Sequence, residues 1–230
     1  MTKRRIVIVG ASRGIGAALV EKLQQDPANE ILALSRNIGE LKRRFDQLDR
    51  VTVAPFDLTE KVREQASDIF SRFDCIDVLI NNAGLLVNKP FEQLSHADIS
   101  ASYQVNVIGV METVQAVLPY LSSKGAHVVN ISSMGGFQGT MKFAGLAAYS
   151  TSKAALCSFT ELFAEEYKDT HIKMNCLCLG AAQTEMLEAA FPGYQAPVSA
   201  AEMAEFIGDF ALNGSRWMNG KILPVSLSTP

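Results

Sequence analysis

Tyr149 and Lys153 lie four residues apart, in the run Tyr149-Ser150-Thr151-Ser152-Lys153. A helix is expected to start here, which would place the phenol and the ammonium about one turn apart on the same face. A tyrosine with an ordinary pKa near 10 moves protons poorly at neutral pH, and a nearby cation lowers that pKa by stabilising the phenolate. The pair is therefore a candidate general acid or base. The same spacing is also common at the start of an amphipathic helix.

A glycine-rich turn is the second candidate site. The run Gly10-Ala11-Ser12-Arg13-Gly14-Ile15-Gly16 follows the first expected strand and opens the first expected helix. Glycines there let the backbone approach a pyrophosphate, which the free N–H groups and the positive end of the helix dipole favour. The spacing Gly-x-x-x-Gly-x-Gly differs from Gly-x-Gly-x-x-Gly, and a plain turn is the alternative. Its position after the first strand favours a nucleotide.

The residues after the second expected strand bear on which dinucleotide would bind. An NAD site would place Asp or Glu there, on the ribose hydroxyl, whereas this sequence has Ser35-Arg36. A guanidinium suits the additional 2′-phosphate of NADP, and Arg13 in the glycine turn could reach the same phosphate. The alternative is that both arginines are solvated surface residues. Together, their positions favour NADP over NAD.

The surrounding sequence predicts the elements that would position these residues. Apolar runs of about four to eight residues rich in Val, Ile and Leu are typical of strands covered on both faces. The expected strands are Arg5–Val9, Glu30–Ser35, Val51–Pro55, Val78–Asn81, His127–Ser132, Ile172–Leu179 and Lys221–Val225. The expected helices are Ile15–Gln25, Glu60–Phe73, Ile99–Leu121, Ala148–Tyr167 and Ala200–Leu212. Their alternation predicts a doubly wound α/β fold with a mostly or fully parallel seven-stranded sheet flanked by helices.

The composition excludes several classes of protein. Of the 230 residues, 48% are hydrophobic, so one ordinary domain with a real core is expected. Lys plus Arg number 21 against 24 Asp plus Glu, a net charge of −3 that disfavours nucleic-acid binding. No apolar run approaches the roughly 18 residues of a membrane span. The run Ile6–Val9 is shorter than the apolar part of a signal peptide, so a cytoplasmic protein is expected.

Cysteine and histidine spacing predicts neither disulfides nor a metal site. Four cysteines are too few for a disulfide scaffold at this length. Cys176 and Cys178 alternate with leucines in an apolar run, which favours buried strand thiols over a redox pair. His96, His127 and His171 lie far apart, and none belongs to a zinc-binding motif.

Taken in order, the motifs resemble the classical short-chain dehydrogenase/reductase family. They are Gly10–Gly16, Asp57, Asn81-Asn82-Ala83-Gly84, Asn106, Ser132-Ser133 and Tyr149 with Lys153. Each motif is weak alone, but they occur at the expected strand ends and cover nearly the whole chain. The resemblance implies one NAD(P)-binding Rossmann-type domain over residues 1–230 and an oxidoreductase that forms a homodimer or homotetramer.

The resemblance also implies catalytic roles. Tyr149 would donate a proton to a carbonyl oxygen, and a serine would hydrogen-bond the same oxygen. Lys153 would bind the nicotinamide ribose and depress the tyrosine pKa, while Asn106 would hold a water in a proton relay. The family pattern favours Ser133 over Ser132, but residues 134–148 form a longer segment than usual, so both serines stay candidates. A structural role is the alternative for Asn106, because a buried polar side chain needs partners.

The cofactor contacts follow from the same resemblance. Asp57, with Leu58, would contact the adenine, and Asn82-Ala83-Gly84 would close over the adenine ribose. Thr184, with Ala182, would touch the carboxamide end of the nicotinamide. The implied cofactor set is Gly10, Ser12, Arg13, Gly14, Ile15, Gly16, Arg36, Asp57, Leu58, Asn82, Ala83, Gly84, Tyr149, Lys153, Ala182 and Thr184.

The sequence departs from the family around the substrate. Val9 replaces a threonine before the glycine turn, and Leu179 replaces a proline after the sixth expected strand. The substrate-side segment, about 181–199, is short. The expected substrate contacts are Ser133, Met134, Phe143 and Tyr149, with further apolar residues at Phe137, Met141, Leu146, Met186, Leu187 and Phe191. This lining favours apolar or aromatic carbonyl compounds, although these residues could instead pack against a second subunit.

The sequence therefore predicts an NADPH-dependent enzyme that reduces a ketone or aldehyde to an alcohol. A 3-oxoacyl thioester reductase is one alternative, for which no basic cluster follows Leu179 to hold an acyl carrier. A non-catalytic NADP-binding sensor or scaffold is the other. Retention of Tyr149, Lys153 and Asn106 argues against that reading.

Overall fold

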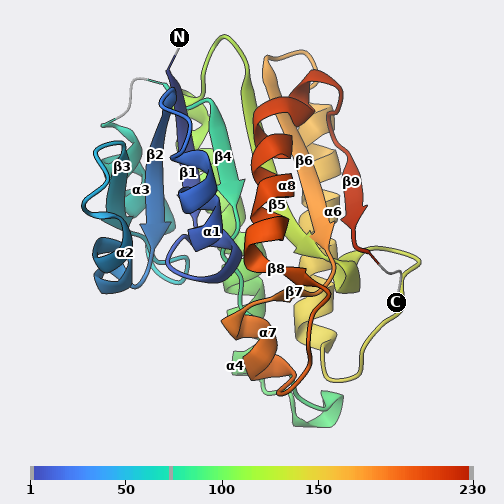
Figure 1. Ribbon diagram of the computed structural model, residues 1–230. Helices are drawn as coiled ribbons and strands as arrows, with labels where there is room; N and C mark the ends of the chain where they lie inside the picture. The colour runs from blue at the N-terminus through green and yellow to red at the C-terminus, as the bar shows by residue number, and fades with distance from the viewer. Residues whose placement is uncertain (1–2, 73–74, 228–230) are drawn as a thin grey trace.

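The computed structural model describes residues 3–72 and 75–227 and contains the predicted parallel sheet (Figure 1). Seven parallel strands lie in the order β3-β2-β1-β4-β5-β6-β9. Their bounds are β1 (Arg4–Val9), β2 (Asn29–Ser35), β3 (Val51–Pro55), β4 (Val78–Asn81), β5 (Ala126–Ser133), β6 (Ile172–Leu179) and β9 (Ile222–Val225). Every predicted strand is present with its ends shifted by at most one residue. The doubly wound α/β prediction is confirmed.

Helices cover both faces of the sheet. They are α1 (Gly14–Leu23), α2 (Ile38–Phe45), α3 (Val62–Phe70), α4 (His96–Tyr103), α5 (Gly109–Val117), α6 (Ala147–Glu166), α7 (Glu185–Ala190) and α8 (Ala200–Asn213). Apolar residues of α1, α2 and α8 pack on one face, and those of α3, α5 and α6 pack on the other. Strand residues alternate between the two cores: Ile6 and Ile8 face the first, Val7 and Val9 the second.

The predicted helix Ile99–Leu121 is interrupted in the structure. It begins earlier, because Ser95 and Asp98 form a capping box before α4. A π-helical turn, Gln104–Ile108, separates α4 from α5, and a 3₁₀ turn, Leu118–Tyr120, ends the segment. The periodicity of apolar residues does not report a π turn, which carries one extra residue.

Two helices were not predicted. In α2 only Leu41 and Phe45 are buried, four residues apart among charged neighbours, and Asn37 caps the start through the amide of Glu40. The six-residue α7 lies in the short substrate-side segment and is capped by Thr184. The predicted helix Glu60–Phe73 spans only Val62–Phe70, and its predicted end at Phe73 lies outside the described residues.

All seven strands point their carboxyl ends toward one edge of the sheet (Figure 1). Beyond this edge lie α4, α7 and a two-stranded ribbon of β7 (Ala182–Gln183) and β8 (Val198–Ser199). Open α/β sheets bind ligands outside their carboxyl edge. Among the described residues, no helix has the length and apolar character needed to cross a membrane.

A buried histidine ties the sheet to α8. His127 is 2% exposed, and its Nδ1 lies 2.9 Å from the Ala211 carbonyl oxygen while its Nε2 lies 3.0 Å from the Asn175 Nδ2. A neutral ring satisfies both contacts, donating to the carbonyl and accepting from the amide. Burial lowers the pKa of His127 to about 4, against the weaker raising effect of the Ala211 carbonyl.

This histidine should make the protein sensitive to mild acid. Between pH 6.5 and 4 the unfolded chain protonates His127 while the folded chain does not, so the free energy of unfolding falls as the pH falls. The loss amounts to about 3 kcal/mol. Urea denaturation of wild type and His127→Gln at several pH values should give a shallower pH dependence for the variant. His171→Gln, at an exposed position, should retain the wild-type slope, and equal slopes for all three proteins would contradict this assignment.

Candidate functional site

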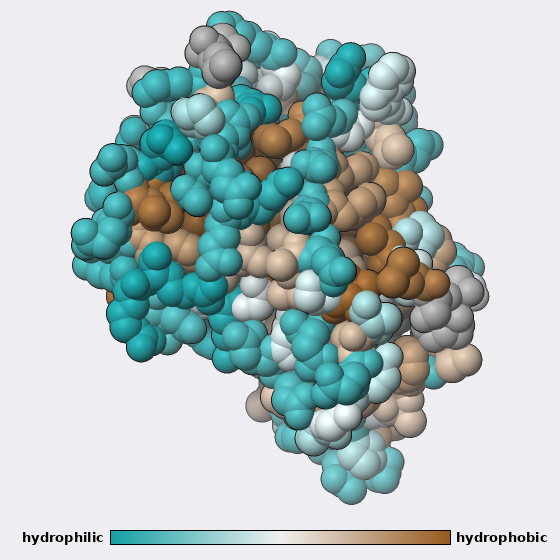
Figure 2. Space-filling view, viewed as in Figure 1, coloured by the Kyte–Doolittle hydropathy of each residue, from teal (hydrophilic) through white to brown (hydrophobic). Residues whose placement is uncertain are grey.

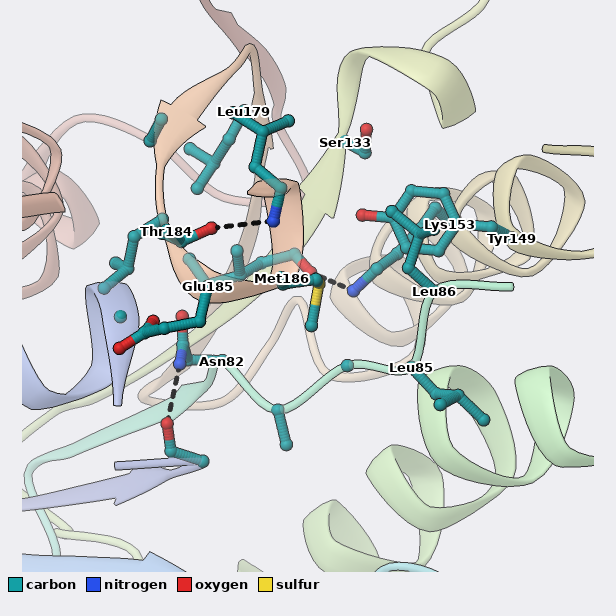
Figure 3. A pocket seen from close by; sticks show the side chains of 18 of the residues that line it. Asn82, Leu85, Leu86, Ser133, Tyr149, Lys153, Leu179, Thr184, Glu185 and Met186 are labelled. Carbon is teal, nitrogen blue, oxygen red and sulfur yellow. Dashed lines mark hydrogen bonds between the residues drawn. The ribbon is translucent and has the colours of Figure 1, made fainter. Parts of the chain in front are cut away.

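A cavity of about 830 Å³ opens at the carboxyl edge of the sheet and contains most of the predicted site residues. Figure 3 shows Tyr149 and Lys153 entering it from α6, and Asn82, Leu85 and Leu86 on the segment that follows β4. From the predicted set, the cavity is lined by Gly10, Ser12, Arg13, Gly14, Ile15, Arg36, Asp57, Leu58, Asn82, Ala83, Gly84, Ser133, Met134, Phe143, Tyr149, Lys153, Ala182 and Thr184. The nucleotide motifs and the proton-transfer pair thus share one cavity.

The glycine turn is packed against the segment that follows β4. Gly10 has φ +86°, and a Cβ there would lie 2.6 Å from the backbone nitrogen of Ala83. A Cβ on Gly16 would lie 2.0 Å from the Gly10 carbonyl oxygen, which also accepts a hydrogen bond of 2.9 Å from Asn82 Nδ2. Gly16 is therefore buried beneath the turn, and other residues of the turn line the cavity. Only glycine permits these approaches, which leave the turn open toward a ligand.

The outer end of the cavity is basic. Arg13 and Arg36 are both exposed there, and neither forms an ion pair with any part of the chain that the structure describes. Beneath them the Ser35 hydroxyl donates to the Ser12 hydroxyl at 3.0 Å. Arg44 does not line the cavity, but it contacts the Ser12 carbonyl oxygen at 3.5 Å and forms an ion pair with Glu21 at 2.6 Å. Sequence reasoning missed Arg44 because the helix that carries it, α2, was not predicted.

Asp57 and Leu58 form the wall at the end of β3. Asp57 accepts hydrogen bonds from the backbone amide and the hydroxyl of Thr59, at 2.9 and 2.7 Å. Leu58 is buried, and its carbonyl oxygen accepts from Gln104 at 2.9 Å. The π turn thus helps to hold this wall.

Tyr149, Lys153 and Ser133 meet at the inner end of the cavity (Figure 3). Lys153 is 3% exposed, and its Nζ donates to the Ile131 carbonyl oxygen at 2.7 Å and lies 5.9 Å from the centre of the Tyr149 ring. Burial lowers the pKa of Lys153 to about 8. Burial raises the pKa of Tyr149, and the hydrogen bond with Ser133 opposes that rise. From the sequence we expected a lowered tyrosine pKa. In the folded chain, however, the loss of solvent around the phenol raises its pKa by more than the neighbouring polar groups lower it.

The two adjacent serines have different surroundings because successive strand residues face opposite ways. Ser133 lines the cavity and lies near enough to Tyr149 to oppose the rise of its pKa. Ser132 is 3% exposed and donates its hydroxyl to the Lys153 carbonyl oxygen at 2.8 Å. Ser133 is thus the partner of Tyr149, whereas Ser132 anchors α6 to β5.

Asn106 connects the π turn to the segment that follows β4 and to α6. Its Oδ1 accepts from the Leu85 amide at 2.8 Å, and its Nδ2 donates to the Leu85 carbonyl oxygen and to the Ser152 hydroxyl, both at 2.9 Å. The side chain is fully buried. Asn106 therefore has the structural role that the sequence left open, fixing the segment after β4 against α6. Its proposed place in a proton relay stays a prediction.

The substrate end of the cavity is largely apolar. Met134 and Phe143 line it, together with Leu85, Leu86, Leu146, Met186, Leu187, Phe191, Tyr194 and Leu227. Phe137 instead packs against a cluster of cysteines, and Met141 is 55% exposed. Thr184, at the start of α7, lies against Gly14, so the short substrate-side segment rests on the glycine turn.

Comparison with known proteins identifies the family. The sequence model of the short chain dehydrogenase family matches residues 4–195. The chain belongs to the short-chain dehydrogenase/reductase family. The fold of this family binds a nicotinamide cofactor, and the chain is an oxidoreductase of this type.

Relatives and solved structures agree with this assignment. The short-chain dehydrogenase described here is 30% identical to an uncharacterized oxidoreductase of Staphylococcus aureus (strain MW2), over 90% of each chain. It is also 30% identical to the ketoacyl reductase HetN of Nostoc sp. (strain PCC 7120), covering 81% of this chain and 66% of that protein. A short chain dehydrogenase structure from Escherichia coli CFT073, complexed with NADPH, superposes with a TM-score of 0.85 at 26% identity, over 97% of each chain.

The contact beneath the glycine turn gives a stability prediction. Gly16→Ala should lower the free energy of unfolding by about 2–3 kcal/mol, because the new methyl group must displace the Gly10 carbonyl. Gly39→Ala is the matched control, since a Cβ at that position in α2 has only an ordinary contact, 3.6 Å from Asn37 Oδ1. It should stabilise by about 0.5–1 kcal/mol. Urea denaturation of both variants measures the difference, and equal stabilities would refute the packing argument.

Proposed function

We propose that this short-chain dehydrogenase uses NADPH to reduce the carbonyl group of an apolar or aromatic ketone or aldehyde to an alcohol. The observation that carries the proposal is the single cavity in which a glycine-lined nucleotide cradle adjoins Tyr149, Ser133 and Lys153. The cradle fits a dinucleotide because side chains at Gly10 and Gly16 would fill it or displace its backbone. When bound, the cofactor supplies the hydride.

The protein's residues would then supply the proton and the orientation. Tyr149 donates its phenolic proton to the carbonyl oxygen as the carbonyl carbon gains the hydride. Ser133 donates a hydrogen bond to the same oxygen and so fixes it beside the phenol. Lys153, held by the Ile131 carbonyl, stabilises the resulting phenolate. The raised pKa of Tyr149 keeps the phenol protonated at neutral pH, which supports its use as an acid in the direction of reduction.

The basic outer end of the cavity supports a preference for NADP(H) over NAD(H). Arg13 and Arg36 place two guanidinium groups where the adenine ribose is expected, and each can pair with a phosphate. Ser35 stands where an NAD site would present a carboxylate. The similar Escherichia coli structure is described as an NADPH complex.

The lining of the inner end supports an uncharged substrate. Lys142, the one cation in residues 134–148, is engaged with its own loop through the Phe137 carbonyl oxygen, at 2.6 Å. Lys153, the cation at the inner end, is bonded to the Ile131 carbonyl oxygen. An anionic substrate would therefore be buried without a free cationic partner, which is costly.

A ketoacyl thioester is the second candidate substrate, favoured by the 30% identity with the ketoacyl reductase HetN. An acyl carrier is an acidic partner, and its docking would need basic residues around the cavity entrance. The segment 181–199 contains two glutamates and no lysine or arginine. A small free carbonyl compound therefore fits this entrance better than a carrier-bound acyl chain.

We further propose that the chain acts as one domain and as a homodimer or homotetramer. The sheet runs from β1 to β9 and so includes strands from both ends of the described chain. Apolar side chains gather at the surface over α8 and β9 in Figure 2. Phe206 on α8 is 45% exposed and stacks on Phe210, and Trp217, between α8 and β9, is 79% exposed. Such a surface suits a second copy of the chain.

Replacement of the phenol tests the proton donor. Tyr149→Phe should lower kcat by roughly 10²–10⁴-fold with little change in NADPH affinity, because it removes the proton donor and little packing area. Tyr167→Phe, at the far end of α6, where the ring stacks on Phe163, should retain wild-type activity. Steady-state rates and a cofactor titration separate these effects. Substantial activity in Tyr149→Phe would exclude the role proposed for this residue, and a wild type inactive toward all carbonyl compounds would favour a non-catalytic sensor.

The cofactor preference can be measured by titration. NADPH should bind at least about tenfold more tightly than NADH, a difference of about 1.4 kcal/mol. Arg36→Ala should weaken NADPH binding and leave NADH binding nearly unchanged, since only NADPH carries the 2′-phosphate. Arg72→Ala, at an exposed position outside the cavity, should alter neither. Equal weakening of both cofactors in Arg36→Ala would remove the basis for the preference.

A matched substrate panel tests the apolar lining. Aromatic diketones should show higher kcat/KM than small 2-oxo acids, because the cavity offers apolar contacts and its inner cation, Lys153, is already bonded to the Ile131 carbonyl oxygen. The short substrate-side segment leaves the cavity open, so high KM values and broad acceptance are expected. NADPH oxidation with both sets of compounds measures the ratio, and higher kcat/KM for the 2-oxo acids would contradict the proposed substrate class.

A further inference from the structure

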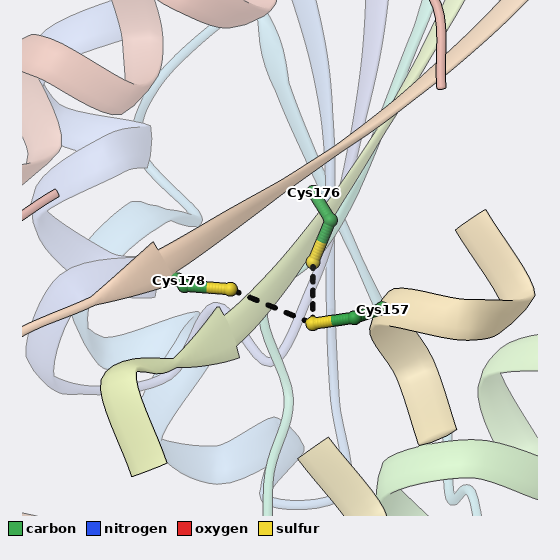
Figure 4. Close-up of side chains that lie close together, drawn as sticks. All are labelled: Cys157, Cys176 and Cys178. Carbon is green, nitrogen blue, oxygen red and sulfur yellow. Dashed lines mark hydrogen bonds between the residues drawn. The ribbon is translucent and has the colours of Figure 1, made fainter. Parts of the chain in front are cut away.

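Three cysteines from separate parts of the chain meet behind the active site. Cys176 and Cys178 lie two residues apart on β6 and so share one face of the strand, and Cys157 reaches them from α6 (Figure 4). The Cys157 sulfur lies 3.5 Å from that of Cys178 and 3.9 Å from that of Cys176. All three sulfurs lie within 4.8 Å of one another, and all three side chains are buried, free thiols.

This spacing is close to that of three thiolates around one metal ion. With metal–sulfur bonds of about 2.3 Å, sulfurs around a shared ion are separated by about 3.8–4.0 Å. The Cys157–Cys176 separation of 3.9 Å lies within this range, and the Cys157–Cys178 separation of 3.5 Å is a few tenths of an ångström below it. Small side-chain rotations would therefore bring the three sulfurs onto one ion without a change of backbone.

The donor atoms point to a soft ion. The cluster packs with Met134, whose thioether is also a soft donor, and with the apolar residues Phe137 and Ile222. In the part of the chain that the structure describes, the group of possible ligands contains these three cysteines and neither histidine nor carboxylate. Soft sulfur donors select copper(I), zinc and iron–sulfur clusters, but structural zinc sites need four ligands. Three thiols in an apolar wall match three-coordinate copper(I).

A short chain of hydrogen bonds links the cluster to Lys153. The Cys157 thiol donates to the Ser132 hydroxyl at 3.5 Å, and Ser132 in turn donates to the carbonyl oxygen of Lys153 at 2.8 Å. Lys153 is itself buried, so the cluster and this residue belong to the same solvent-excluded layer.

We propose that Cys157, Cys176 and Cys178 form a three-coordinate binding site for copper(I). Each thiol that ligates the ion releases its proton to solvent, and the ion keeps its oxidation state, so no oxidant or reductant takes part in binding. Cys157 lies one helical turn after Lys153 and contacts Ser132, which anchors α6. Occupancy of the site should therefore also slow the reduction proposed above, but copper binding does not depend on that activity.

A competition titration tests the site directly. The reduced full-length protein is titrated under anaerobic conditions with the copper(I) complex of bicinchoninate, and copper transfer is followed by loss of the coloured complex. We expect one tightly held copper per chain, with ultraviolet absorption from thiolate-to-copper charge transfer. Cys157→Ser should weaken binding by roughly 100-fold or more, since loss of a ligand exceeds the 10–100-fold cost of losing a partner of a ligand. Cys178→Val, which keeps an apolar side chain of similar size, should do the same.

A control variant and several contrary results make the titration decisive. Cys75 lies outside the cluster and is half-buried, so Cys75→Ser should bind copper as wild type does, and circular dichroism should show all three variants folded. Equal binding by Cys157→Ser and wild type would refute the site, as would complete retention of copper by bicinchoninate. Tighter binding of zinc than of copper(I) would overturn the choice of metal. A loss of two hydrogens in the mass of the air-exposed protein, with no copper retained, would show a disulfide pair instead.

Discussion

The attachment of α6 to β5 determines the chemistry available to this protein. Three buried hydrogen bonds make it: Ser132 to the Lys153 carbonyl, Lys153 Nζ to the Ile131 carbonyl, and Asn130 to the Thr160 hydroxyl. Because they lie in an apolar interior, breaking any one leaves a polar group without solvent. They fix the height of α6 along the strand. Tyr149, one turn before Lys153, is thereby held beside Ser133.

Two further close contacts complete the cavity around that attachment. Asn106 satisfies both backbone groups of Leu85, and Asn82 is bonded to the Gly10 carbonyl. The segment between them, which includes Gly84, passes close to Lys153: a Cβ on Gly84 would lie 3.4 Å from its Nζ. Backbone, lysine and nucleotide turn are thus positioned by one network. The cost is a buried ammonium, whose pKa falls to about 8.

The proposed proton-transfer groups and the proposed copper site share one wall of the molecule. Ser132 contacts both the Lys153 carbonyl oxygen and the Cys157 sulfur. The lysine and the thiol cluster therefore lie on either side of one serine, within the same buried layer between α6 and β6. Charge placed on the sulfurs acts on Lys153 through a medium that screens it weakly. This proximity is the physical reason to expect that the state of the thiols affects the site.

The sequence by itself determined where the strands lie along the chain and their parallel character, because strands buried on both faces are apolar over nearly their whole length; their order in the sheet came from the structure. It also placed the glycine turn, Arg36, Tyr149 and Lys153 at one edge, since these residues follow strands or open helices. It did not determine the pKa of Tyr149, which depends on how much solvent the folded chain excludes. Nor did it find the π turn around Asn106, the helix carrying Arg44, or the meeting of Cys157 with Cys176 and Cys178. Those features arise from contacts between residues distant in sequence, and only the packing of helix on sheet brings such residues together.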